Sequence, residues 1–376
     1  MRIGIDARMY GAATTTGIGV YIESLTQELF RLDTQNEYVL LLRPDRYAEF
    51  LEPNQRVSKI LCEIPWYGWE EQLKLPTLLK KLKLDLVHFP HFNVPLLYTR
   101  PFLVTVHDTT PKLFPGPRVQ KSILRKFGYE RVMRSSLRRA RRVLTISNHT
   151  KSNLKTYYGV DDNKVLVTSL GVAPRFKPVT DPVLLEQSKV MHGISKPFLL
   201  YIGVWRDHKN IPGLVKAFEL LRKRGIDCQL VLGGNPDPRY PEVIAAVEDS
   251  TERDNIILPG FISEQDLPVL YSAAAVFVLP SFAEGFGLVA IEAAACGTPV
   301  AASESTSLPE VMGQAARYFD PRRPDAMADV IEPLLSDQKI RSEIIQAGIT
   351  KAATYTWEAC ARQTLAAYQK ASSKFA

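Results

Sequence analysis

A glycine-rich segment in the second half of the chain carries two glutamates eight residues apart. Glu284 lies among the glycines, and Glu292 follows them. Residues 275–279 are apolar and predict a buried strand, while the small and apolar residues from Leu288 onward predict a helix. Free N–H groups at a helix start can hold a diphosphate, and carboxylates accept hydrogen bonds from sugar hydroxyls. The segment therefore has the chemistry to bind a phosphorylated sugar.

A second predicted strand, residues 198–203, ends just before two cations, Arg206 and Lys209. Cations at the end of a strand can stabilise a leaving phosphate as its negative charge develops. The alternative is ordinary surface charge, and these two residues taken alone leave both interpretations open.

Two features of the first half occupy similar positions. A loop that contains Gly17 and Gly19 precedes a predicted helix, which is typical of an anion-binding turn. Ile22 stands where the dinucleotide-binding fingerprint has its third glycine, so the loop is not that fingerprint. His107 stands at the carboxyl end of a predicted strand, where ligand-binding residues lie in such sheets. The alternatives are a loop that only turns the chain and a histidine with a structural role.

Strand and helix signals alternate along nearly the whole chain, and the alternation restarts after residues 171–178. This pattern is typical of parallel sheets covered by helices on both faces. We therefore predict an α/β protein with two Rossmann-like doubly wound domains that face each other across a cleft. Residues 1–178 form the first domain, residues 179–355 the second, and residues 356–376 a helix that returns to the first. The cleft is the expected active site.

The composition excludes several classes of protein. Of 376 residues, 45% are hydrophobic and 23% are charged, which excludes a disordered or fibrous chain. The four cysteines are far apart and form no Cys-x-x-Cys pair, which argues against disulfides or a zinc site and favours a reducing compartment. No Asp-x-Asp pair ends a strand, so we expect no metal. A secretory signal and a membrane-spanning run are not recognisable, and we expect a cytoplasmic protein.

The positive charge is concentrated in one segment. The net charge is +7, and the segment Arg118–Arg142 alone holds ten basic residues and one acid. Such a segment is either a solvated helix face or a surface for an anionic partner. Nucleic acid is the less favoured partner, because only Phe127 and Tyr129 are interleaved with the cations for base stacking. An anionic membrane surface is the partner that we consider, since apolar residues precede the segment.

The two glutamates and their surroundings resemble the E-x7-E motif of the retaining glycosyltransferases of family 4, which have the GT-B fold. The resemblance runs nearly from end to end, because further segments match the family in order and spacing. These segments are Gly17–Tyr21, Val106–Asp108, Leu144–Ser147, Gly171–Pro178, Gly203–Asn210, Gly260–Ser263, Pro280–Ala293, Ala295–Val300 and Leu308–Glu310.

The resemblance implies that the C-terminal domain binds a sugar nucleotide and the N-terminal domain binds an acceptor. It assigns Glu292 to the nucleotide ribose and Glu284 to hydroxyls of the donor sugar. It places Ile262 and Leu267 at the nucleotide base and Lys209 at the diphosphate. The same likeness implies donor contacts from the backbone of the loop residues Gly285, Phe286, Gly287 and Leu288.

In the N-terminal domain, the resemblance places Gly17 and Gly19 below the diphosphate and His107 beside the transferred sugar. One position departs from the family pattern. Many relatives have a basic residue directly before the lysine, whereas this chain has His208 there. We therefore assign the second catalytic cation to Arg206.

These likenesses predict a retaining, metal-independent hexosyltransferase that needs no cofactor beyond its donor. In relatives the leaving phosphate itself takes the acceptor proton. UDP-glucose is the favoured donor and GDP-mannose the next, and the acceptor is a saccharide, lipid-linked if the enzyme works at the inner face of the membrane. Cell-envelope or exopolysaccharide assembly is the expected process. The alternatives are a nucleotide-sugar epimerase or phosphorylase on the same fold, and a protein that binds anionic polymers.

Overall fold

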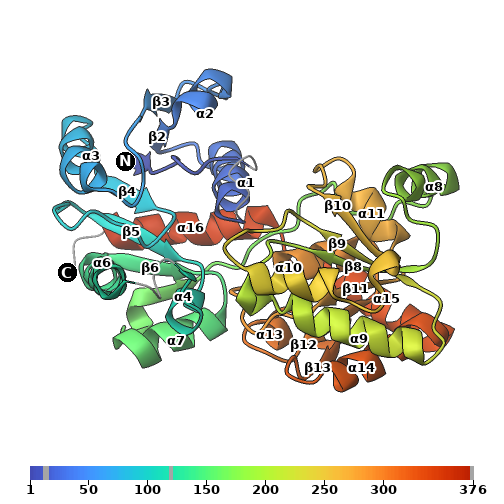
Figure 1. The fold of residues 1–376 in the computed structure, drawn as a ribbon. Coiled ribbons are helices and arrows are strands. Elements are labelled where there is room, and N and C mark those ends of the chain that lie inside the picture. Colours follow the sequence, from blue (N-terminus) through green and yellow to red (C-terminus); the bar gives the residue numbers. More distant parts are fainter. Residues whose placement is uncertain (12–16, 118–121, 373–376) are drawn as a thin grey trace. The chain divides into compact units, whose positions relative to one another are not determined.

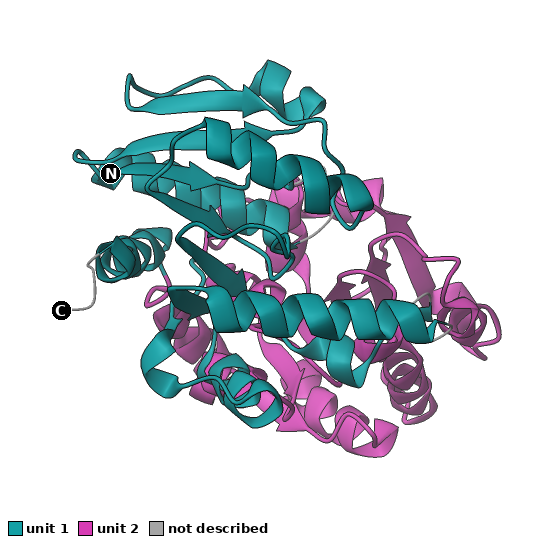
Figure 2. Ribbon diagram, turned by 90° about the vertical axis from the view of Figure 1, so that its left-hand side faces the viewer, with its two compact units in different colours: residues 1–171, 356–376 teal, residues 172–355 magenta. Residues whose placement is uncertain are grey.

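A computed structural model describes all residues except 12–16, 118–121 and 373–376. The chain divides into two compact units (Figures 1 and 2). Unit 1 comprises residues 1–171 and 356–376, and unit 2 comprises residues 172–355. The sequence predicted a division after Pro178, whereas the units divide after Gly171.

Unit 1 is built on a seven-stranded sheet in the order β3-β2-β1-β4-β5-β6-β7, with every strand parallel to its neighbours. The inner strands are buried along nearly their whole length, as expected for a sheet with both faces covered. The strands are β1 (Arg2–Ile5), β2 (Glu37–Leu42), β3 (Val57–Leu61), β4 (Leu86–Phe89), β5 (Phe102–Val106), β6 (Arg142–Thr145) and β7 (Val165–Val167).

The first and last helices of unit 1 pack against each other, although they are more than 300 residues apart in the sequence (Figure 1). An ion pair of 2.7 Å between Arg31 and Glu358 joins them at the surface. The helices of unit 1 are α1 (Gly17–Leu32), α2 (Pro44–Glu49), α3 (Trp69–Lys81), α4 (Thr110–Leu113), α6 (Ile123–Arg139), α7 (Asn148–Tyr158), the 3-10 turn η2 (Asp162–Lys164) and α16 (Trp357–Ser372).

Unit 2 has a six-stranded parallel sheet in the order β10-β9-β8-β11-β12-β13. Its strands are β8 (Phe198–Ile202), β9 (Gln229–Gly233), β10 (Ile256–Gly260), β11 (Val276–Leu279), β12 (Val300–Ser303) and β13 (Arg317–Phe319). Its helices are α8 (Pro182–Met191), α9 (Ile211–Lys223), α10 (Pro241–Glu248), α11 (Leu267–Ala273), α12 (Leu288–Ala295), α13 (Leu308–Met312), α14 (Pro324–Ser336) and α15 (Gln338–Ala352), with 3-10 turns η3 (Asp207–Lys209), η4 (Arg253–Asn255) and η5 (Gly313–Ala315).

These two parallel sheets with flanking helices confirm the predicted α/β class. The basic segment forms α6 and leads into β6, while its residues Arg118 and Lys121 lie outside the described part of the chain. Residues 12–16 of the glycine-bearing loop also lie outside it. Gly17 and Gly19 open α1, and His107 follows β5 directly.

Candidate active site

The glycine-rich segment connects β11 to α12 in unit 2, and one glycine in it has a backbone conformation that other residues rarely adopt. Gly287 has a φ angle of +87°, and a β-carbon there would lie 2.3 Å from Leu308 Cδ2. The positive φ makes any larger residue strained here, and a β-carbon would also force the Leu308 side chain to shift. Phe286 is buried and packs edge-on against Tyr355, with ring centroids 5.2 Å apart. The backbone of residues 285–288 is thereby held at the start of α12.

Glu284 is held from several sides by residues of unit 2. Lys209 Nζ lies 2.7 Å from Glu284 Oε1, and Ser281 Oγ donates a hydrogen bond of 2.6 Å to the same oxygen. Burial alone would raise the pKa of Glu284, but the Lys209 cation and the Ser281 hydrogen bond outweigh it and lower the pKa below its ordinary value. Glu284 is therefore ionised at neutral pH.

Lys209 reaches Glu284 because two loops are fastened to each other. Asn210 adopts a left-handed conformation with φ +54°, and its side-chain amide donates hydrogen bonds to the carbonyls of Pro280, at 3.1 Å, and Pro321, at 2.7 Å. The amide of Phe282 donates to the carbonyl of His208 at 2.8 Å. Arg206 lies in the same loop, and its buried Nε atom has no hydrogen-bond partner among the described residues.

Glu292 has the opposite environment. Its residue is 7% exposed, and among the described residues its carboxyl group has no hydrogen-bond partner or ion pair. Burial raises the pKa of Glu292 to about 8, because the attraction of Arg175 does not offset desolvation and Glu264 adds repulsion. Arg175 is engaged elsewhere, in an ion pair of 3.0 Å with Glu264. Glu292 is therefore a mostly protonated acid at neutral pH, without a partner among the described residues.

The two residues assigned to the nucleotide base also belong to unit 2. Ile262 lies in the loop after β10 and is buried, and Leu267 is half-buried at the start of α11. The amide of Leu267 donates a hydrogen bond of 3.0 Å to the carbonyl of Ser263, which holds the loop to the helix. Ile262 and Leu267 therefore lie close together in the sequence, one in the loop between β10 and α11 and the other at the first residue of α11.

In unit 1, His107 is held as a neutral imidazole. Its Nε2 atom donates a hydrogen bond of 2.8 Å to the carbonyl of Pro90, and the ring meets Tyr21 edge-on at 4.8 Å between centroids. Burial lowers the pKa of His107, although Pro90 and Asp108 oppose that shift. Because Nε2 carries the proton, Nδ1 offers a lone pair. Nearby, Gly17 is exposed and Gly19 is buried.

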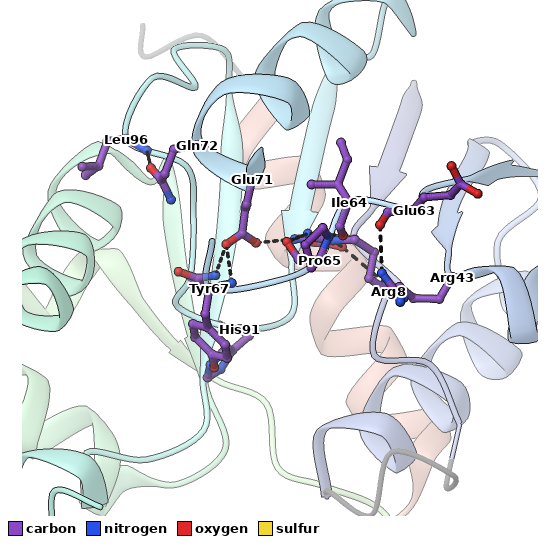
Figure 3. Close-up of polar contacts among 12 residues, drawn as sticks. Arg8, Arg43, Glu63, Ile64, Pro65, Tyr67, Glu71, Gln72, His91 and Leu96 are labelled. Atoms are coloured by element: carbon purple, nitrogen blue, oxygen red, sulfur yellow. Dashed lines mark hydrogen bonds and ion pairs between the residues drawn. The ribbon is translucent and has the colours of Figure 1, made fainter. Parts of the chain in front are cut away.

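A buried ionic network in unit 1 was not anticipated from the sequence (Figure 3). Arg8 lies 2.7 Å from Asp6 and 2.6 Å from Glu71, and Glu71 is fully buried. The other carboxylate oxygen of Glu71 accepts hydrogen bonds from the amide of Tyr67 at 2.9 Å and from Asn93 Nδ2 at 2.5 Å. Burial raises the pKa of Glu71, since desolvation outweighs the attraction of Arg8. The network fastens the start of α3 to the loop after β1.

The structure thus brings Glu284 and Lys209 into contact within unit 2, while His107, Gly17 and Gly19 belong to unit 1. Among the described residues, no group of three His, Cys, Asp or Glu side chains is arranged to hold a metal ion. The four cysteines are buried free thiols. Within the described ranges, no helix is long and apolar enough to cross a bilayer.

Comparison with known proteins gives these residues a context. Residues 186–351 match the family model "Glycosyl transferases group 1", and residues 15–176 match "Glycosyltransferase Family 4". The chain is 33% identical over 300 residues to the O-antigen chain mannosyltransferase B of Escherichia coli, covering 77% of this chain and 76% of the relative. It is 29% identical over 281 residues to the O-antigen chain mannosyltransferase RfbU of Salmonella typhimurium, covering 73% of each chain.

Solved structures match the fold over the residues of both units. Sucrose-phosphate synthase from Thermosynechococcus elongatus has a TM-score of 0.79 at 22% identity, covering 98% of each chain. The Anabaena protein HepE in complex with UDP-glucose has a TM-score of 0.76 at 15% identity, covering 98% of this chain and 99% of HepE. These likenesses concern the fold alone, which is the GT-B fold. From the sequence matches and the fold, the chain belongs to glycosyltransferase family 4, the glycosyl transferases of group 1.

Proposed function

We propose that this glycosyltransferase moves a hexose from a nucleotide-diphosphate sugar to a saccharide acceptor during envelope polysaccharide assembly, with retention of the anomeric configuration. The observation that carries the proposal is the contrast between two carboxylates of unit 2. Glu284 is ionised and paired with Lys209. Glu292 is only 7% exposed, its pKa is raised by burial, and it has no hydrogen-bond or ion-pair partner among the described residues. A largely desolvated acid without a protein partner can hydrogen-bond a ligand.

In this proposal, unit 2 binds the donor. Glu292 accepts hydrogen bonds from the ribose hydroxyls, and Glu284 accepts them from the sugar. Ile262 and Leu267 contact the base. The backbone of Gly285, Phe286, Gly287 and Leu288 meets the sugar and the diphosphate at the start of α12, where free N–H groups favour an anion.

The chemical step is chiefly electrostatic. The bond between the anomeric carbon and the phosphate oxygen breaks, and the acceptor oxygen bonds to the same face of that carbon. The acceptor proton passes to the leaving phosphate. Lys209 and Arg206 stabilise the charge that builds on this phosphate, so neither a protein nucleophile nor a metal or other cofactor is required.

In the same proposal, unit 1 binds the acceptor. The Nδ1 lone pair of His107 accepts a hydrogen bond from a hydroxyl of the transferred sugar, which suits an imidazole kept neutral by burial. The backbone at Gly17 and Gly19 lies against the diphosphate, at the start of α1.

For the donor, we favour GDP-mannose over UDP-glucose. Two relatives with 33% and 29% identity are mannosyltransferases of O-antigen chains. The protein seen with UDP-glucose shares 15% identity and supports the fold alone. The names of the same relatives support a growing polysaccharide chain as the acceptor. We further propose that this saccharide is carried on a lipid and that the enzyme works at the inner face of the membrane.

The test is ligand-dependent stability followed by turnover. A nucleotide at one hundred times its Kd stabilises a folded protein by about 2.7 kcal/mol, so GDP should raise the melting temperature clearly and UDP or ADP should not. Mannose transfer should persist in EDTA. Stabilisation by UDP alone would overturn the mannose donor, and a strict requirement for Mg²⁺ or Mn²⁺ would overturn the metal-free mechanism.

A further inference from the structure

The first turns of α6 project into solvent with three large apolar side chains. Ile123, Leu124 and Phe127 are 87%, 83% and 63% exposed. The turn is nevertheless a defined helix, since Ser122 caps it by accepting a hydrogen bond of 3.3 Å from the amide of Arg125. Exposed apolar side chains that gather in one place mark a surface for an apolar partner.

The same face of α6 continues as a row of arginines. Leu124 and Phe127 are followed, at alternating intervals of four and three residues, by Arg131, Arg134 and Arg138, all exposed. Such intervals keep side chains on one face of a helix. The opposite face contributes Met133, Ser136 and Leu137 to the interior. The outer face is therefore apolar at its beginning and cationic for the rest of its length.

A second group of exposed apolar side chains lies on α3 and in a loop near it. We call this group and the one at the start of α6 the two apolar points. Trp69 and Leu73, four residues apart, are 84% and 60% exposed, and Leu97 in a nearby loop is 60% exposed. Gln72 of α3 accepts a hydrogen bond of 2.8 Å from the amide of Leu96, which holds that loop to the helix. Arg139 of α6 holds the loop's other side through the carbonyls of Pro95 and Tyr98. Hydrogen bonds thus hold this loop to both α3 and α6.

Both apolar points belong to the same face of unit 1. The helices α3 and α6 lie at the left of Figure 1, and that side faces the viewer in Figure 2. Both helices follow strands of one parallel sheet, β3 and β5, so both begin at its carboxyl edge. His107 stands at that same edge, directly after β5.

We propose that this face, formed by Trp69, Leu73, Leu97, Ile123, Leu124 and Phe127 with the arginine row of α6, docks on a bilayer that contains anionic lipid. Charge complementarity favours such a partner, because the arginines match anionic headgroups. Two separate apolar points suit a deformable acyl layer better than a rigid protein surface. This docking would place the carboxyl edge of the sheet, where His107 lies, near the bilayer. That this position serves a lipid-borne acceptor rests on the proposed function.

Sedimentation of the full chain with vesicles tests the docking. The vesicles are pure phosphatidylcholine, or roughly equal parts of phosphatidylcholine and phosphatidylglycerol. Binding should require phosphatidylglycerol and weaken in high salt. Removing Arg131 and Arg138 (R131Q/R138Q) should weaken it about five-fold for each charge. The triple variant I123S/L124S/F127S should weaken it at least ten-fold.

The matched control removes three exposed apolar residues from unit 2. Val183, Val190 and Met191 of α8 are 59%, 69% and 68% exposed. The variant V183S/V190S/M191S should bind vesicles like the parent chain. An equal loss in this control would mean general stickiness and would overturn the proposal. Absence of binding, or binding indifferent to lipid charge, would do the same.

Fluorescence tests the second point. Trp69 emission should shift to the blue on vesicles with phosphatidylglycerol and should be quenched by brominated acyl chains, and W69F should lose that response. If the chain bound vesicles but Trp69 emission neither shifted nor was quenched, α3 would not belong to the docking face. If single-stranded oligonucleotide displaced the vesicles and the apolar variants bound normally, the face would be a polyanion site instead.

Nucleotide binding, measured without vesicles, should be unchanged in every variant, so that failure of the docking is separable from failure of the proposed function.

Discussion

Two buried glutamates, one in each unit, show how differently the same side chain is used. Glu71 lies in the first turn of α3 and Glu292 in the second turn of α12, and both are nearly or fully buried. Glu71 contacts Arg8, the amide of Tyr67 and Asn93, whereas Glu292 has no partner among the described residues. A buried carboxyl group that is satisfied internally stabilises the fold. A buried carboxyl group without partners is available to a ligand.

The largest expected effect is the loss of Glu71. Glu71→Ala leaves Arg8 with one carboxylate and two donors without acceptors, and breaking a buried ion pair costs about 3–5 kcal/mol. Urea unfolding should therefore show a lower free energy of unfolding by that amount. The neighbouring Glu70, whose exposed side chain pairs with Lys74 at 3.0 Å, is the control. Glu70→Ala should cost at most about 1 kcal/mol. Equal costs would contradict a structural role for the network.

The roles of Glu292 and Glu71 also differ in how far the sequence alone predicts them. Glu292 was identified because strand, glycines, Glu284 and helix follow one another within twenty residues. The partner of Glu71, Arg8, is 63 residues away, and no local pattern connects them. The left-handed conformation of Tyr67, with φ +64°, is also imposed by its surroundings rather than by its residue type.

Two of the elements that the sequence did not reveal, β3 and α3, lie near Glu71. The strand β3 has a lysine at its centre and lies at the edge of the sheet, so the apolar run is interrupted. The helix α3 contains Pro76, which argues against a helix in any single-sequence interpretation. The buried strands with continuous apolar runs, such as β8 and β11, were recognised because burial on both faces leaves that signature.

Glu284 combines features of the two glutamates compared above. It has an ion-pair partner in the protein, Lys209, and it is also proposed to bind the donor sugar. Its partner Lys209 should matter most when charge builds on the diphosphate, so Lys209→Ala should lower kcat roughly 100- to 1,000-fold. Steady-state rates at saturating donor measure this. Lys216, exposed on α9, is the control, and Lys216→Ala should keep the parent rate. A Lys209→Ala enzyme within a few-fold of the parent would show that the pair is only structural.

Glu292→Gln tests the unpartnered member of the comparison. If Glu292 binds the ribose, the loss of a charged acceptor should raise the donor KM roughly 10- to 100-fold and change kcat little. Glu248, exposed at the end of α10, is the matched position, and Glu248→Gln should leave KM unchanged. An unaltered KM in the Glu292 variant would remove this residue from the ribose.

The stability of the same variant separates the two glutamates further. The folded-state pKa of Glu292, about 8, is above its ordinary value of 4.5. The stabilisation that the protonated form provides is therefore complete below pH 4.5 and is lost as the pH rises through about 8. The neutral glutamine avoids that loss. Without nucleotide, Glu292→Gln should be more stable than the parent at pH 8 and similar to it at pH 4.5; lower stability at pH 8 would mean that the carboxylate has a structural partner.

The smallest expected effect is the pH dependence of donor binding. In the free enzyme Glu292 is mostly protonated at pH 6.5 and about half ionised at pH 8, given its pKa of about 8. Ribose hydroxyls donate to the ionised carboxylate, so the bound state favours deprotonation and binding releases a proton. Nucleotide affinity should therefore rise about ten-fold between pH 6.5 and pH 8, as titration calorimetry would measure. In Glu292→Gln the affinity should be weak and nearly flat over that range. A parent affinity that falls with rising pH would mean that the protonated acid, acting as a donor, is the form that binds.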